Sequence, residues 1–221
     1  MIKPRIVETD EGIQDEFDVR TYNNSMMRRL RDKGWMETDH ISASGITYGL
    51  ALEIGPGPGY LGLEWLKKTE STMLIAVEVS SEMTKIAEKN AREYGLEGRV
   101  KYVKGYAHQI SFGDNTFDGV FTNGSLHGWS QPIRVFDEVY RVLKPGAKYF
   151  ISDMRRDMNP FVRRFMKLMV KPKEIRPGFE SSINASYTTD EIRSILDQSN
   201  LKESVVAKTF MGFEITGVKS K

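Results

Sequence analysis

The chain has 221 residues, which is enough for one α/β domain with a substantial core and a small elaboration. It contains no cysteine, which excludes disulfides, thiolate metal sites and a cysteine nucleophile, and its net charge of +2 gives no overall argument for nucleic-acid binding. No apolar run approaches the roughly 20 residues that span a bilayer and the N-terminus lacks an apolar signal core, so we expect a cytoplasmic protein without a membrane span.

The first 45 residues are expected to form a helical cap ahead of the main domain. Residues 1–15 are polar, which indicates a loosely held segment. From Phe17 to Ile41 the pattern is helical and rich in methionine. We therefore assign residues 1–45 to an N-terminal helical cap and residues 46–221 to the main domain.

Strands and helices alternate through the main domain. Strands are expected at 49–54, 73–79, 99–103, 117–122 and 148–152, with helices at 60–68, 81–94 and 133–143 between them. Gly95 ends the second helix and Pro145-Gly146 ends the third. A helix and two strands close the chain, at 189–196, 203–208 and 210–218. This alternation is typical of a parallel sheet with helices on both faces.

Residues 155–187 interrupt the alternation, and we expect them to form a lid-like insertion. Residues 155–176 hold eight lysines and arginines against two acids. Phe161, Phe165, Leu168 and Met169 fall at i, i+4, i+7 and i+8 and form an apolar stripe with basic flanks. Such a helix could cover an acceptor, rest on a membrane surface or nucleic acid, or dock on the sheet with its basic side solvated.

The stretch Glu53-Ile54-Gly55-Pro56-Gly57-Pro58-Gly59 is the most informative part of the chain. It ends an apolar strand with an acid and places glycine at every second position of the following loop. With no side chains in the way, the backbone can approach a ligand closely. The amides at the start of the next helix favour an anionic or polar group. A carboxylate facing this pocket suits a cation, such as an amino group, better than a pyrophosphate.

The run Glu53-x-Gly55-x-Gly57-x-Gly59 resembles motif I of the class I S-adenosyl-L-methionine (SAM) methyltransferases. Further matches follow in the family's order. Glu78 ends the second strand, 19 residues after Gly59, and resembles the ribose-binding acid of the family. Gly105-Tyr106-Ala107 resembles the short motif that touches adenine, residues 117–123 resemble the fourth strand, and residues 138–147 resemble the turn before strand five. The set is specific for the family but not for the methyl acceptor.

The resemblance implies the class I methyltransferase fold, which is Rossmann-like. In this α/β fold a seven-stranded, mostly parallel sheet carries helices on both faces and ends in an antiparallel C-terminal strand. It also implies that SAM is the cofactor, bound at the carboxyl ends of the strands near the switch point between strands one and four. The expected cofactor-binding residues are Tyr22, Glu53, Gly55, Pro56, Gly57, Gly59, Glu78, Val79, Met83, Tyr106, Ala107, His108, Asn123, Gly124 and Leu126.

Two acids would hold opposite ends of the cofactor. Glu53 would hold the ammonium group, directly or through water, and Glu78 would accept hydrogen bonds from both ribose hydroxyls. Tyr106 stands where the family often has an acid, so the adenine amino group would need a backbone carbonyl or Gln109 instead. The plain structural alternative for the glycine loop is a tight strand–helix turn with an incidental acid.

His127 is the best-placed titratable group for the transfer step. It could act as a general base on an acceptor hydroxyl, amine or acidic carbon, or it could hydrogen-bond within its loop and shape the pocket. Methyl transfer depends mainly on alignment and exclusion of water, so a base is needed only if the acceptor must lose a proton. Trp129, Phe161 and Phe165 are candidate acceptor contacts. The other histidines lack metal-ligand spacing, and no metal site is expected.

The sequence therefore predicts a SAM-dependent methyltransferase that acts on a small-molecule acceptor. The alternatives are an RNA or protein methyltransferase that uses the basic 155–176 segment, and a non-catalytic SAM-binding protein. Nucleic acid is less favoured as a partner than a small molecule, because a single basic helix without an RNA-binding module is weak evidence for RNA binding. A nicotinamide dehydrogenase fits poorly, since Tyr60 stands where the dinucleotide fingerprint has its third glycine. The sequence does not predict the oligomeric state.

Overall fold

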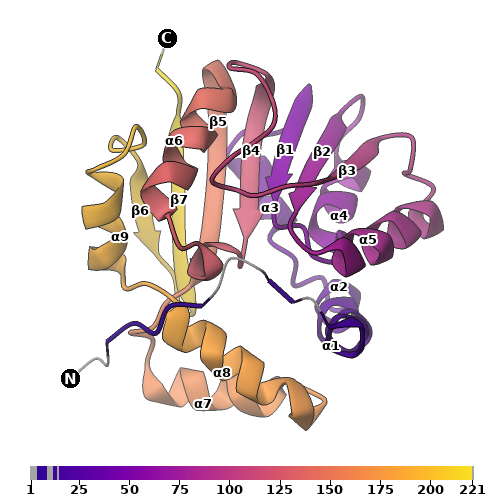
Figure 1. Ribbon diagram of the computed structural model, residues 1–221, viewed down its shortest axis with the longest axis vertical. Coiled ribbons are helices and arrows are strands. Elements are labelled where there is room, and N and C mark those ends of the chain that lie inside the picture. Colours follow the sequence, from indigo (N-terminus) through magenta and orange to yellow (C-terminus); the bar gives the residue numbers. More distant parts are fainter. Residues whose placement is uncertain (1–3, 9–11, 14, 221) are drawn as a thin grey trace.

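A seven-stranded sheet in the order β3-β2-β1-β4-β5-β7-β6 forms the centre of the molecule (Figure 1). The computed structural model describes residues 4–8, 12–13 and 15–220, and of residues 16, 17, 25 and 26 it describes only the backbone. The strands are β1 (Leu50–Ile54), β2 (Met73–Glu78), β3 (Val100–Lys104), β4 (Phe117–Asn123), β5 (Leu143–Met154), β6 (Val205–Lys208) and β7 (Gly212–Val218). Strands β1 to β5 pair in parallel, and β7 runs antiparallel to β5 and β6. The expected fold class is confirmed.

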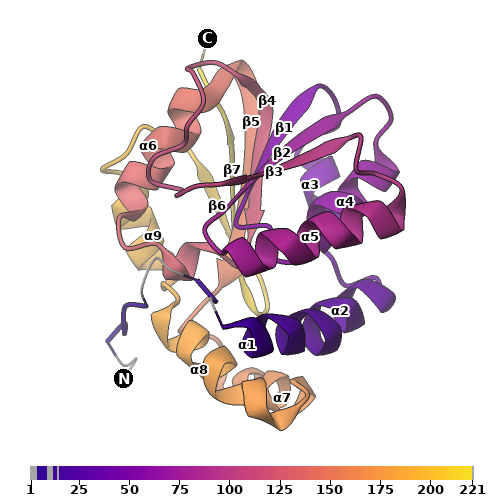
Figure 2. The same ribbon diagram turned by 45° about the vertical axis from the view of Figure 1, so that its right-hand side comes forward.

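Helices cover both faces of the sheet (Figure 2). One face packs against α6 (Pro132–Val142) and α9 (Thr189–Leu196), and the other packs against α3 (Thr38–Ala43), α4 (Tyr60–Lys68) and α5 (Ser81–Tyr94). Each interface is an apolar cluster of side chains removed from water, which is the main stabilising term for such layers.

Strand β1 shows how the alternation of side chains positions the site. Leu52 and Ile54 point into the cluster under α6 and α9, whereas Ala51 points into the cluster under α4. Successive side chains of a strand face opposite sides of the sheet, so Glu53 shares the side of Ala51. The acid that precedes the glycine loop therefore lies beneath α4.

Local signals place the main helices where the sequence predicts them. Helix α5 begins after Ser80, whose hydroxyl oxygen accepts a hydrogen bond from the Met83 amide at 3.2 Å, and it ends at Gly95 with a φ of 65°. Helix α9 begins with a capping box between Thr188 and Glu191. In both cases a capping side chain satisfies amides that the first turn leaves unpaired.

The N-terminal region is helical as expected, but it is divided into several short pieces. They are α1 (Glu16–Thr21), a π-helical turn η1 (Tyr22–Met27), α2 (Arg28–Asp32) and α3. Ile41 of α3 is buried in the same apolar cluster as Leu61 and Trp65 of α4. The last of these helices therefore packs within the core of the main domain, and the boundary at residue 45 stays a prediction.

Strand β5 begins at Leu143, five residues before the expected start. Leu143 pairs with Phe117, and the register then shifts before Lys148 pairs with Gly119. The sequence placed Pro145-Gly146 in a turn before the strand, whereas the structure places them at an irregularity within it. Gly146 has a φ of 79°, a conformation that favours glycine.

The insertion after β5 is a helical hairpin of α7 (Pro160–Met169) and α8 (Arg176–Ala185), joined by a short turn that includes η3 (Lys173–Ile175). We call residues 160–185 the α7–α8 hairpin. Val162 of α7 packs with Phe179 and Ile183 of α8. Phe161 and Phe165 are 83% and 62% exposed. These two residues of the expected apolar stripe therefore lie on the outer face of α7. A second apolar face of the same helix packs against α8.

Among the described residues, no helix combines the length and apolar character required to cross a bilayer. The same residues contain no group of three or more histidine and acidic side chains that could hold a metal ion.

Candidate functional site

The loop between β1 and α4 holds three glycines in the left-handed region, with φ values of 64°, 54° and 81° for Gly55, Gly57 and Gly59. A Cβ on Gly55 would lie 2.8 Å from the Cβ of Ser125, and a Cβ on Gly59 would lie 2.5 Å from the Tyr102 hydroxyl. A Cβ on Gly57 would meet nothing within 4 Å. Two of the glycines are thus required by packing, and Gly57 is the one that borders open space where a ligand can approach.

Glu78 closes one side of this space. Its carboxylate accepts hydrogen bonds from the amides of Gly57 at 3.0 Å and Ser80 at 2.9 Å, which fixes its orientation. Burial raises the pKa of Glu78, and the backbone amides of Ser80, Gly57 and Val79 oppose the rise. A carboxylate has about four acceptor positions, so these amides leave acceptor capacity free. The geometry therefore suits a pair of vicinal hydroxyl donors.

Glu53 lies between β1 and the first turn of α4, with 2% of its surface exposed. The Gly62 amide donates to its carboxyl group, but Oε2 has no partner, and neither has the nearby Tyr102 hydroxyl. Burial and the neighbouring Glu78 raise the pKa of Glu53 to about 8. An orphaned buried carboxyl oxygen is satisfied by a cationic group or by a water molecule that such a group orients. The residues present fit an ammonium-bearing cofactor in this respect.

Tyr22 comes from the π-helical turn η1 and is half-buried. Loss of solvent, with smaller contributions from the carboxylates of Glu78 and Asp153, raises its pKa to about 12. The tyrosine therefore lies within electrostatic reach of both acids. Its neighbour Asn23 accepts a hydrogen bond from Asn90 at 3.3 Å, and Asn90 also donates to the backbone carbonyl of Pro58 at 2.8 Å. This network ties η1 to the glycine loop.

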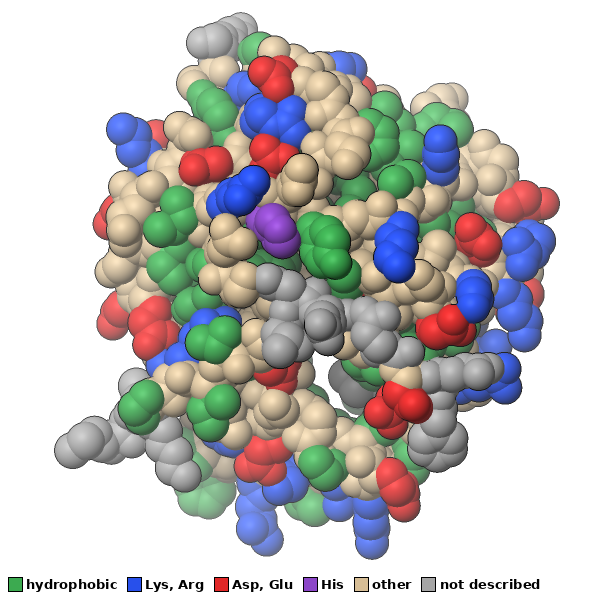
Figure 3. Space-filling view, in the orientation of Figure 1, with side chains coloured by type: hydrophobic (Ala, Val, Ile, Leu, Met, Phe, Trp, Pro, Cys, Tyr) green, Lys and Arg blue, Asp and Glu red, His purple; other side chains and the backbone are tan. Residues whose placement is uncertain are grey.

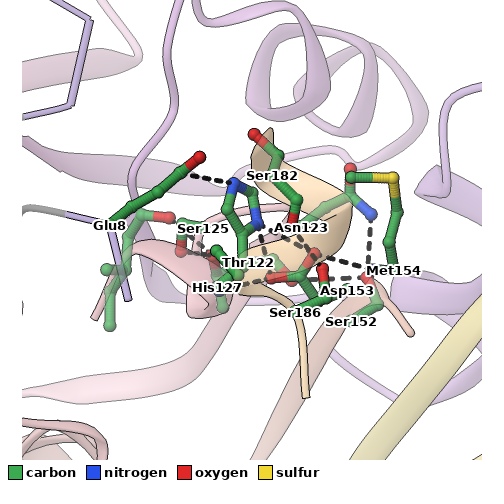
Figure 4. A network of polar contacts seen from close by, with 12 residues as sticks. Glu8, Thr122, Asn123, Ser125, His127, Ser152, Asp153, Met154, Ser182 and Ser186 are labelled. Atoms are coloured by element: carbon green, nitrogen blue, oxygen red, sulfur yellow. Dashed lines mark hydrogen bonds and ion pairs between the residues drawn. The ribbon is translucent and has the colours of Figure 1, made fainter. Parts of the chain in front are cut away.

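A histidine–aspartate pair stands at the carboxyl ends of β4 and β5 (Figure 4). His127 lies in the 3-10 turn η2 (Leu126–Gly128), and its Nδ1 is 3.0 Å from Oδ2 of Asp153. The backbone amides of His127 and Met154 each donate to the same carboxylate at 2.7 Å. Burial lowers the pKa of His127, but the carboxylate of Asp153 outweighs it and the net pKa is raised. With Nδ1–H directed to Asp153, Nε2 is the nitrogen that can take a proton.

Residues 4–8, which we call the N-terminal segment, lie near the carboxyl ends of the strands, beside η2 and the end of α8 (Figures 1 and 2). Arg5 donates to the backbone carbonyl of Ala185 at 2.5 Å and to that of His127 at 2.8 Å, and it stacks on the Tyr187 ring at 4.1 Å. Glu8 then lies 3.8 Å from Nε2 of His127. Figure 3 shows a hollow on this face between the α7–α8 hairpin and the rest of the molecule. The segment therefore borders the candidate site on its outer side.

A half-buried carboxylate, Glu37, is linked to Asn123 through the Ser152 hydroxyl. The Asn123 amide donates to the Ser152 hydroxyl at 2.9 Å, and that hydroxyl donates to Glu37 at 2.5 Å. Burial raises the pKa of Glu37. Sequence reasoning missed Glu37 because it lies within the Phe17–Ile41 region, where no motif marks it. It also missed Asp153, although a polar pair, Ser152-Asp153, at the carboxyl end of a parallel strand is a recognisable signal.

The remaining expected cofactor residues differ in how far they are exposed. Met83 is 4% exposed, and Tyr106 is 48% exposed with its ring centroid 5.3 Å from that of His108. Leu126 is fully buried in the core and anchors η2. Gly124 borders open space, Pro56 is buried, and Val79, Ala107 and His108 are half-buried.

The three candidate acceptor contacts lie either in the core or on the outer face of α7. Trp129 is 6% exposed and packs edge-on against Phe136, with ring centroids 5.8 Å apart. Its ring belongs to the core cluster that supports the site. Phe161 and Phe165 lie on the outer face of α7 and point to solvent. The packing of these three residues gives no support to an acceptor pocket, and their assignment as acceptor contacts stays a prediction.

The comparisons with known proteins agree with this geometry. Residues 52–151 match the family model described as a methyltransferase domain. A ubiquinone/menaquinone biosynthesis C-methyltransferase from Idiomarina loihiensis is 27% identical over 211 residues, covering 93% of this chain and 82% of that protein. One from Hydrogenovibrio crunogenus is 25% identical over 175 residues, covering 77% and 69%. A solved SAM-dependent methyltransferase from Aquifex aeolicus has a TM-score of 0.69 at 21% identity, covering 94% of this chain and all of that one.

The fold and the glycine loop define a class I methyltransferase. Residues 52–151 form a methyltransferase domain, and SAM is the cofactor of this protein.

Proposed function

We propose that the protein transfers the methyl group of SAM to a small-molecule acceptor whose reacting atom is activated by loss of a proton. The observation that carries the proposal is the His127–Asp153 pair at the carboxyl ends of β4 and β5, beside the glycine loop. The C-methyltransferase relatives are named for ubiquinone and menaquinone biosynthesis. An aromatic ring that carries acidic hydroxyls, such as a hydroquinone, is therefore the acceptor class that we propose first.

Residues of the loop region would hold the cofactor. Glu78 would accept from the ribose hydroxyls, and Gly57 would let the cofactor lie against bare backbone. The orphaned oxygen of Glu53 would face the ammonium group. Tyr22 would lie across the site, because it is within reach of both Glu78 and Asp153. Bound SAM supplies an electrophilic methyl group that leaves with its bonding electrons remaining on sulfur.

His127 would remove the acceptor proton. Its Nε2 takes the proton from a ring hydroxyl, and the electron pair left on oxygen raises the nucleophilicity of the ring carbon that forms the new bond. Asp153 holds the imidazole in the tautomer that leaves Nε2 free and stabilises the imidazolium after proton transfer. The proton of the methylated carbon is lost afterwards, which restores the aromatic ring. A positioned base of this kind contributes about 10²–10⁴-fold to a rate.

The N-terminal segment and η1 would exclude water from the reacting groups. Arg5 fixes the segment to α8 and to the His127 carbonyl, and Asn90 fixes η1 to the glycine loop. Dispersal of charge during methyl transfer is favoured in a site with little water. The cysteine-free sequence fits a reducing compartment, and we propose the cytoplasm.

The test is incubation of the protein with SAM labelled in its methyl group and a panel of hydroquinones, phenols, amines, RNA and protein extracts. The proposal expects label on a small hydroxylated ring compound, with carbon as the methylated atom. Label on RNA or protein would support the alternative acceptors. Binding of SAM with no transfer to any acceptor would support a non-catalytic protein.

A further inference from the structure

The outer face of α7 carries large apolar side chains with no cover from the described residues. Phe161, Phe165 and Leu168 are 83%, 62% and 54% exposed, and their i, i+4, i+7 spacing places them on one side of the helix. The opposite side of α7 is buried, because Val162 and Val170 pack against α8. An exposed apolar row of this kind marks a surface that binds a protein partner or a membrane.

Basic side chains flank this row. Arg164, Lys171 and Lys173 have no ion pair among the residues that the structure describes, and Lys171, Lys173 and Arg176 line an open hollow at the end of α7. Two further cations, Arg163 and Lys167, share Glu180. Residues 160–185 hold six lysines and arginines against two acids. The hairpin therefore has an excess of positive charge beside its apolar row.

The shape of this surface distinguishes among partners. Figures 1 and 2 show the hairpin projecting below the carboxyl ends of the strands, with α7 on its outer side. The phenylalanines protrude from a convex helix, whereas single-stranded nucleic acid needs a groove with stacking platforms. Protruding apolar side chains with a basic rim are typical of helices that lie in a lipid interface, where the chains enter the acyl boundary and the cations meet anionic headgroups.

We propose that the outer face of α7, with the basic rim of Arg164, Lys171 and Lys173, docks on a lipid bilayer that contains anionic headgroups. Helix α8 contacts the turn that carries His127, and Ala185 at its end accepts from Arg5. Docking through α7 would therefore place the candidate methyl-transfer site close to the lipid surface. The docking itself does not depend on the proposed function.

The experiment is co-sedimentation of the full chain with vesicles of phosphatidylcholine alone and of phosphatidylcholine with phosphatidylglycerol. We expect sedimentation with the anionic vesicles and a steep loss at high salt. Phe161→Ser combined with Phe165→Ser should abolish binding. Lys171→Gln combined with Lys173→Gln should weaken it by roughly fivefold per residue, which corresponds to about 1 kcal/mol for each cation near the surface.

Matched control variants distinguish binding through this face from non-specific binding to vesicles. Tyr48 and Met73 are 61% and 46% exposed near the amino ends of β1 and β2, so serine at both positions should leave binding unchanged. Lys101→Gln combined with Lys202→Gln removes the same charge elsewhere. Circular dichroism and melting temperatures verify that each variant folds.

A direct readout of insertion uses tryptophan at the row. Phe161→Trp should show quenching by brominated lipids in anionic vesicles, whereas Tyr48→Trp should show no quenching above wild type. Failure of the wild type to sediment with anionic vesicles overturns the proposal. The proposal is also overturned if the double phenylalanine variant still binds vesicles but has lost a concentration-dependent dimer. The same holds if this variant still binds vesicles but has lost RNA binding.

Discussion

Asp153 holds His127 through both its side chain and its backbone. One carboxylate oxygen accepts from the His127 amide at 2.7 Å and lies 3.0 Å from Nδ1 of the ring. The Met154 amide fixes the other oxygen. The strand end of β5 thus sets the position, the tautomer and the basicity of a histidine that belongs to the loop after β4.

Asp153→Asn should lower the turnover number by about 10²–10⁴-fold, because the asparagine neither orients the ring nor stabilises its charged form. Loss of the carboxylate also removes the interaction that raises the pKa of His127. The acid limb of the pH–rate profile should then move to lower pH. Steady-state kinetics across pH would show this, and Asp157→Asn serves as the control. An unchanged profile would show that the pair is structural.

Glu78→Ala should weaken SAM binding by roughly 1–3 kcal/mol, because ribose hydroxyls and two backbone amides lose their acceptor. Glu78→Gln keeps one carbonyl oxygen and should fall between alanine and wild type. Isothermal titration calorimetry measures the affinities, with Glu82→Ala in the first turn of α5 as the control. Equal affinity for all variants would place the ribose elsewhere.

SAM binding should release a proton near pH 7 if the ammonium group meets Glu53. The free protein holds this carboxyl with a pKa of about 8, so it is mostly protonated at pH 7. A neighbouring cation lowers the pKa and expels the proton. Calorimetry in buffers with different heats of ionisation counts the proton, and Glu53→Gln should abolish its release. A binding heat that is independent of buffer would place the ammonium elsewhere.

Glu53 should also make the stability of the free protein depend on pH. Its folded pKa is raised from the ordinary value of 4.5 to about 8, so the folded state retains a proton that the unfolded state loses. The stabilising contribution is complete below about pH 4.5 and is lost as pH rises through about 8. Melting temperatures from pH 5 to 9 should fall less steeply for Glu53→Gln than for wild type. Parallel curves would contradict the burial of an ionisable carboxyl.

Arg5→Ala should loosen the N-terminal segment with little change in global stability. It removes hydrogen bonds to Ala185 and His127 and the stack on Tyr187. Local opening of this kind is detected by faster cleavage with a glutamate-specific protease. Arg92→Ala, on the exposed side of α5, is the control. Cleavage at the wild-type rate would show that Arg5 does not hold the segment.

The sequence predicted the parts of the fold whose signals are local. The glycine loop, the helix that begins at Ser81, the Gly95 stop and the alternating apolar runs each have signals over a few residues, and the structure places them as expected. The mostly parallel sheet with an antiparallel C-terminal strand followed from the resemblance to the family. The extended start of β5 was not predicted, because it depends on the pairing of Leu143 with Phe117 across the sheet.

For the candidate site, too, only the features with local sequence signals were predicted. Glu78 and the glycine loop have short-range signals, whereas the partnership of His127 and Asp153 joins residues from two separate strand ends. The apolar stripe of α7 could not show which side of the helix is exposed, because the helix has apolar residues on two sides and α8 covers only one. Which side is buried depends on tertiary packing.

Transfer of labelled methyl from SAM to a hydroquinone, measured for the wild type and for His127→Asn at saturating SAM, tests the central claim most directly. The account predicts carbon-methylated product from the wild type and a loss of about a hundredfold or more in the variant, with SAM affinity unchanged in calorimetry. Equal turnover by the two proteins, or SAM binding without transfer to any acceptor, would contradict it.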